Sequence, residues 1–157
     1  MATAPAPADP RRFPFPPGIP PAAWLAGWLL ERVWPIAIAW PEWARPIGWF
    51  LLLAPWAFAI WAVRTFRRQG TVVDPRGNVT TVVTTGPFRI TRNPMYLTLV
   101  TSYLGGTLAF HLEWGFVLLI PVVLALHFGV ILREERYLEA KFGDAYREYR
   151  RRVRRWF

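Results

Sequence analysis

The side chains best suited to chemistry lie in two short polar stretches of an otherwise apolar chain. Arg92, Asn93 and Tyr96 surround a proline that ends the central polar segment, and Glu134 and Glu135 follow the last long apolar run. A guanidinium binds a carboxylate or a phosphate through two parallel hydrogen bonds, and carboxylates accept protons and hydrogen bonds. The combination predicts a site for a polar or charged ligand. A thiol nucleophile is excluded, because the chain has no cysteine.

The elements between the two stretches should bring them together. Spans over about 94–110 and about 115–132 are joined by only four residues, so they are expected to form an antiparallel hairpin. The start of one span then lies at the same membrane face as the end of the other. His127 precedes Glu134 by seven residues, or two helical turns, so we expect His127 to point toward the same cluster. Ionisable residues at this depth are costly and often functional.

Simpler interpretations of these residues stay open on spacing alone. Arg92 and the two glutamates could form surface ion pairs worth under about 1 kcal/mol. His127 could be an ordinary packing residue. The run of arginines from Arg150 to Arg155 is most simply an anchor to anionic lipid, at about 1 kcal/mol for each basic residue.

The apolar residues indicate an integral membrane protein. The chain of 157 residues is 54% hydrophobic, with ten Trp, and its apolar residues are blocked into long runs that a water-soluble domain of this length could not bury. Two further spans are expected over about 19–34 and about 46–64. The predicted fold is therefore all-α, with about four transmembrane helices, a cytoplasmic loop and a helical basic C-terminal tail.

The polar segments complete the predicted organisation. Residues 1–17 are rich in Pro and Ala and are expected to form a disordered arm, and residues 18–157 are expected to form a single domain. The alternating, β-branched sequence TVVDPRGNVTTVV (residues 71–83) has a turn signal at its centre, which favours a small β-hairpin in the loop.

The charges set the orientation and exclude one class of partner. The formal net charge is +9, and all basic residues except Arg32 and Arg45 lie before the first span, in the central loop or after the last span. This bias is typical of a polytopic protein with both termini in the cytoplasm, and it argues against nucleic acid as the partner. The strong preference for Arg over Lys suggests a GC-rich bacterial genome, so the bacterial inner membrane is the expected location.

Three motifs in order resemble one known superfamily. The first is Arg92-Asn93-Pro94-Met95-Tyr96, the second is Glu134-Glu135, and the third is the Phe-Gly-x-x-Tyr-x-x-Tyr pattern of residues 142–149. Together they resemble the isoprenylcysteine carboxyl methyltransferases and phospholipid methyltransferases, which are small integral-membrane enzymes that use S-adenosylmethionine. The resemblance covers residues 64–157. Asn93 stands where the carboxyl methyltransferases usually have His, and the Asn-Pro-Met-Tyr form is similar to the phosphatidylethanolamine N-methyltransferases.

The resemblance implies roles for individual residues. It places the donor between the last two spans and the C-terminal segment, with Arg92 and Glu135 as catalytic residues and no metal. The implied cofactor-binding residues are Asn93, Pro94, Tyr96, His127, Arg133, Glu134, Glu135, Tyr146 and Tyr149. Arg92 would orient an anionic acceptor, and the lipophilic acceptor would enter sideways from the bilayer.

The function expected from these observations is methyl transfer from S-adenosylmethionine to a lipid or lipophilic carboxyl or amine acceptor. Two alternatives are an NADPH-dependent membrane reductase of the same architecture and a non-catalytic membrane assembly or scaffold protein. The expected partners are the lipid bilayer and a lipophilic small-molecule or lipid substrate, and the sequence leaves the oligomeric state open.

Overall fold

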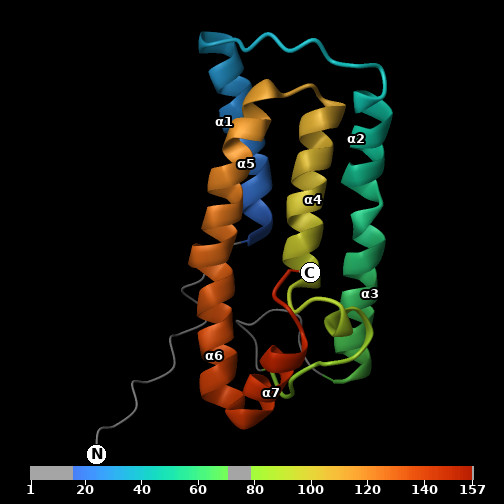
Figure 1. The fold of residues 1–157 in the computed structure, drawn as a ribbon, viewed down its shortest axis with the longest axis vertical. Helices are drawn as coiled ribbons and strands as arrows, with labels where there is room; N and C mark the ends of the chain where they lie inside the picture. The colour runs from blue at the N-terminus through green and yellow to red at the C-terminus, as the bar shows by residue number, and fades with distance from the viewer. Residues whose placement is uncertain (1–15, 71–78, 157) are drawn as a thin grey trace, which may run out of the picture.

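The computed structural model describes residues 16–70 and 79–156, and these residues form an elongated bundle of helices (Figure 1). A short 3-10 helix, η2 (Pro16–Gly18), leads into the first long helix. The helices are α1 (Ile19–Val33), α2 (Ala44–Leu53), α3 (Pro55–Arg68), η3 (Gly86–Arg89), α4 (Pro94–Ala109), α5 (Glu113–Leu126), η4 (His127–Ile131), α6 (Leu132–Phe142) and α7 (Asp144–Arg152). The predicted all-α fold is confirmed, and each of the four predicted spans is helical.

Proline and glycine residues determine where several of these helices begin and end. Pro94 stands at the first helical position of α4, where the missing N–H would have no partner in the helix, and Pro55 stands where α3 continues from α2. Gly143 separates α6 from α7 with a φ of 55°, a conformation that favours glycine. The chain therefore turns sharply at Gly143, which lays α7 across the end of the bundle.

Helix α4 is the central element of the bundle, and it packs against α1, α2, α3 and α5. Tyr103 on α4 is fully buried, and its hydroxyl donates a hydrogen bond to the carbonyl of Gly115 at 3.0 Å. Trp24 of α1 stacks on the Tyr103 ring with 5.6 Å between ring centroids. These contacts tie α1, α4 and α5 together in the apolar half of the molecule.

Two continuous helices are long and apolar enough to cross a membrane. One covers Ala44–Arg68, through α2 and α3, and the other covers Glu113–Phe142, through α5, η4 and α6. Large apolar side chains project outward from these helices, and Phe50, Leu53, Ile120 and Phe128 are each at least 60% exposed. Exposed apolar surface on this scale is typical of a surface that contacts a membrane or another protein.

The segments outside the long helices differ in part from expectation. The described part of the predicted hairpin, residues 79–83, is not a strand, and residues 71–78 lie outside the described residues. Of the predicted disordered arm, residues 1–15 also lie outside the described residues, whereas Pro16 and Pro17 belong to η2. Instead of pairing as strands, the described loop residues pack their apolar side chains against α3 and α7.

Candidate active site

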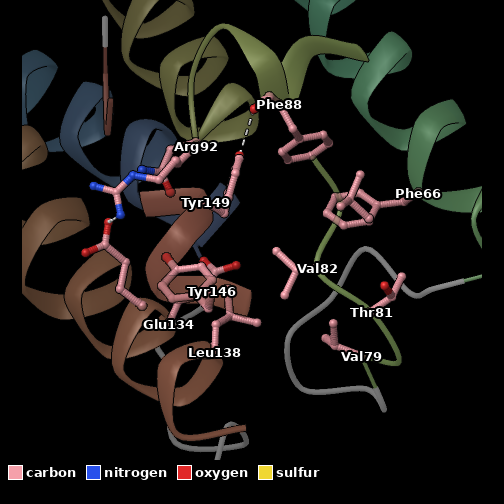
Figure 2. Close-up of a pocket in the computed structure, with 13 residues that line it drawn as sticks. Phe66, Val79, Thr81, Val82, Phe88, Arg92, Glu134, Leu138, Tyr146 and Tyr149 are labelled. Carbon is pink, nitrogen blue, oxygen red and sulfur yellow. Dashed lines mark hydrogen bonds and ion pairs between the residues drawn. The ribbon is translucent and has the colours of Figure 1, made fainter. Parts of the chain in front are cut away.

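A pocket of about 60 Å³ lies at the polar end of the bundle, between α6, α7, the end of α3 and residues 79–93 (Figure 2). One wall is apolar and consists of Phe66, Val79, Val82, Val83, Phe88 and Leu138. The other wall is polar and consists of Arg92, Asn93, Glu134, Glu135, Tyr146 and Tyr149. The pocket thus offers an apolar face and a charged face to the same ligand.

Arg92 and Glu135 form a buried ion pair in the polar wall. Arg92 Nη1 lies 3.1 Å from Glu135 Oε1, and each side chain is only 8% exposed. Arg155 completes the arrangement, because its Nε and Nη2 donate to the two oxygens of Glu135 at 2.9 and 2.8 Å. Glu135 is therefore held by two guanidinium groups, one of them through a bidentate contact.

The Arg92 guanidinium has hydrogen-bonding capacity that the protein does not use. Among the described residues, its buried Nε and Nη1 atoms have no hydrogen-bond partner. Nη1 faces Glu135 as an ion pair without hydrogen-bond geometry. A buried donor without an acceptor costs about 1–3 kcal/mol, and these donors are able to bind an acceptor group of a ligand.

The residues around Pro94 are fixed by the C-terminal segment. The Asn93 side-chain amide donates to the carbonyl of Arg155 at 3.0 Å, and the Thr91 hydroxyl donates to the same oxygen at 2.9 Å. Pro94 is buried and begins α4, but it does not line the pocket. Asn93 therefore reaches the pocket wall with its amide already engaged.

Tyr96 and Glu134 connect α4 to α6. The Tyr96 hydroxyl donates to Glu134 Oε2 at 2.7 Å. Glu134 lines the pocket, whereas Tyr96 lies behind it in the apolar core. Tyr96 thus contacts a pocket residue without itself forming part of the wall.

Tyr146 and Tyr149 are the residues that α7 contributes to the polar wall of the pocket. Both are buried, and the Tyr149 hydroxyl donates to the carbonyl of Phe88 at 2.9 Å (Figure 2). Burial, with a smaller contribution from the Glu135 carboxylate, raises the pKa of Tyr146 to about 12. Burial also raises the pKa of Tyr149. Both phenols are therefore neutral at physiological pH and can donate hydrogen bonds.

Besides Pro94 and Tyr96, two further predicted cofactor-binding residues, His127 and Arg133, do not line the pocket. Arg133 is exposed on α6, and His127 packs edge-on against Phe128 with 4.8 Å between ring centroids. His127 does not point toward the pocket because the π-helical turn η4 begins at this residue. A π-turn accommodates one extra residue, so Glu134 lies about 100° around the helix from the position that α-helical spacing predicts.

The sequence does not predict two features of the site, which are the contact of Arg155 with Glu135 and the apolar wall of the pocket. The basic run predicts a lipid anchor that includes Arg155, and no sequence pattern predicts that α3 and residues 79–83 form an apolar wall. No local sequence signal separates Arg155 from the arginines around it. The β-branched run at 79–83 indicates burial, but its alternation predicts a strand, which these residues do not form.

The fold and the site together define an all-helical membrane-type protein with a charged pocket at one end of the bundle. The model for the phospholipid methyltransferase family matches residues 43–145, and the chain belongs to this family. The resemblance predicted from the sequence is thus confirmed, and the protein is a methyltransferase by family. Over 62 residues the chain is 44% identical to an uncharacterized protein of Haemophilus influenzae, a match covering 40% of this chain and 98% of that protein. No solved structure matches the chain at a significant level.

Proposed function

We propose that this protein is a membrane-embedded methyltransferase that uses S-adenosylmethionine and acts on a lipid acceptor with an anionic group. The observation that carries the proposal is the buried Arg92 guanidinium, with unused donors, in a pocket that has one apolar and one charged wall. An anionic lipid headgroup with an apolar tail complements both walls. The family match supports both the reaction class and a lipid acceptor.

The polar wall fits the donor in its chemistry. Glu134 and Glu135 would accept hydrogen bonds from the ribose hydroxyls and the amino group of S-adenosylmethionine. The neutral phenols of Tyr146 and Tyr149 would hydrogen-bond to the adenosine or pack against it. The volume of about 60 Å³ is below the roughly 300 Å³ typical of ligand pockets. Ligand binding is therefore expected to move the wall formed by residues 79–83, which contains no helix.

Methyl transfer requires alignment of donor and acceptor and the exclusion of water more than it requires strong acid–base catalysis. S-adenosylmethionine supplies an electrophilic methyl group when it is bound. The protein would hold the acceptor in line through Arg92, and its buried apolar wall would exclude water. An amine acceptor must also lose a proton, and Glu134 or Glu135 would take it, whereas a carboxylate acceptor needs no base.

Calorimetry of the detergent-solubilised protein tests this proposal. S-adenosylhomocysteine should bind with measurable heat, NADPH should not, and Glu134→Ala or Glu135→Ala should weaken the binding of S-adenosylhomocysteine. Heat with NADPH alone would favour a reductase. Neither heat nor a thermal shift with either ligand would favour a non-catalytic membrane protein.

A further inference from the structure

The segment that follows α7 runs back to the start of α4 (Figure 1). Val153 has an extended conformation, with φ −122° and ψ 129°, and ends the helix. The Arg92 backbone N–H donates to the carbonyl of Arg154 at 3.0 Å, and Thr91 and Asn93 both donate to the carbonyl of Arg155. The end of the described chain is thereby fixed against the residues that carry Arg92.

The Arg155 side chain reaches into the site from this segment. Its fork makes two hydrogen bonds with Glu135, and the Glu135 carboxylate raises the pKa of Arg155 chiefly through them. The other arginines of the tail behave differently. Arg150, Arg151 and Arg152 pair with Glu139 or Glu148 at the surface, and Arg154 is exposed.

We propose that Arg155 is a positioning residue for methyl transfer, which holds Glu135 in the pocket wall with its side chain and the Thr91–Asn93 step with its backbone. The proposal rests on the proposed function and extends it from the motif residues to the tail. Arg155 acts through Glu135 and Asn93, and it does not touch the reacting atoms.

The burial of Glu135 explains why a second guanidinium is needed. A buried carboxylate is stable only with its charge balanced and its lone pairs hydrogen-bonded. Arg92 faces Glu135 without hydrogen-bond geometry, so the two hydrogen bonds that orient the carboxylate come from Arg155. Lysine would restore the charge but not the planar fork.

The test compares two adjacent arginines with opposite environments. Arg155→Ala and Arg154→Ala remove the same charge from the same segment, and both leave the backbone carbonyls in place. Calorimetry with S-adenosylhomocysteine should show about tenfold weaker binding for Arg155→Ala, a change within about twofold for Arg154→Ala and an intermediate value for Arg155→Lys.

A double-mutant cycle separates positioning from general destabilisation. If Arg155 acts through Glu135, adding Arg155→Ala to Glu135→Gln should weaken binding by no more than about threefold beyond Glu135→Gln alone. Full multiplication of the two effects, or equal binding by Arg155→Ala and Arg154→Ala, would overturn the proposal.

Hydrogen exchange gives a readout that does not need the ligand. The Arg155 side chain anchors the tail to Glu135, and the Arg92 amide donates to the carbonyl of Arg154 in that tail. If this side-chain anchor keeps the backbone carbonyls of the tail against the Thr91–Asn93 step, exchange of the Arg92 amide should accelerate at least about tenfold in Arg155→Ala and stay unchanged in Arg154→Ala. Unchanged exchange in both variants would overturn the role of the Arg155 side chain in holding the tail against the step. Failure of the wild-type protein to bind S-adenosylhomocysteine would overturn the proposed function and the role of Arg155 in binding the methyl donor. The exchange result would still decide whether Arg155 holds Arg92 in place.

Discussion

Arg92 carries an energetic cost that its neighbours do not remove. It is buried, it is paired with a glutamate already held by Arg155, and two of its nitrogens have no hydrogen-bond partner among the described residues. The attraction within the ion pair alone is not expected to offset the free-energy cost of removing the Arg92 charge from water. An anionic acceptor would supply the missing oxygen atoms, which is consistent with a role in binding substrate.

The first prediction separates acceptor positioning from donor binding. Arg92→Ala should cut methyl transfer by about tenfold or more, equivalent to about 1.4 kcal/mol of transition-state stabilisation. Donor binding should change little, because Arg155 still holds Glu135. The measurement pairs calorimetry with transfer of label from the donor into total lipid extract. Loss of donor binding in this variant would instead place Arg92 in the cofactor pocket.

The second prediction concerns alkaline stability. The pKa of Tyr146 is about 12 in the folded protein, whereas an unfolded tyrosine titrates near 10. The folded state thus keeps a proton that the unfolded state loses. The stabilisation is complete below about pH 10 and is lost as the pH rises toward 12, at up to about 1.4 kcal/mol per pH unit.

Tyr146→Phe should therefore make the unfolding free energy fall less steeply between pH 10 and 12. Thermal unfolding of the solubilised protein across this range is the measurement. Tyr137→Phe, which lies outside the pocket, is the control. An identical alkaline slope for the wild-type protein and Tyr146→Phe would show that the buried phenol does not govern this loss.

At the scale of elements, α4 is held against α2 and α3 by close backbone contact and by hydroxyl groups. Ser102 and Thr98 donate hydrogen bonds to the carbonyls of Leu52 and Pro55 at 3.0 and 3.1 Å, on either side of the junction between α2 and α3. Because Pro55 has no N–H, the helix is locally weakened there. Ser102 and Thr98 are small enough to allow close contact at this face, and they also supply hydrogen bonds at a weakened point of the neighbouring helix.

The third prediction tests this close contact. A Cβ added to Gly105 would overlap the backbone of Leu52, so Gly105→Ala should lower the unfolding free energy by about 1–3 kcal/mol or more. Gly27→Ala is the matched control, because its Cβ would meet its nearest neighbour at an ordinary 3.4 Å. Equal thermal stability for the two variants would mean that α2 and α4 separate easily.

For the whole molecule, the distribution of polar and apolar surface defines two ends. The charged pocket, α6 and α7 lie at one end, and the α1–α2 and α4–α5 connections lie at the other (Figure 1). The distribution of basic residues predicts that the positively charged end faces the cytoplasm.

The fourth prediction follows from this polarity. Reporter fusions after Phe157 and between Asp74 and Asn78 should both report the cytoplasm. A fusion within the α4–α5 turn, near His111, should report the opposite side and serves as the control. A periplasmic signal from either of the first two fusions would contradict the predicted topology.

The sequence by itself determined the helices, their antiparallel pairing and the motif residues that face one another. Long apolar runs can bury their backbone polar groups only as helices, and the four-residue turn leaves only a hairpin, so Arg92 and Glu135 had to meet.

Tertiary structure decided the rest. The π-turn at His127 changed which face Glu134 occupies, and a backbone register of this kind depends on packing along the whole helix. Arg155 entered the site because the sharp turn at Gly143 and the path of the tail bring it to Glu135, over contacts between residues far apart in the chain. Local composition describes Arg155 only as one basic residue in a basic run.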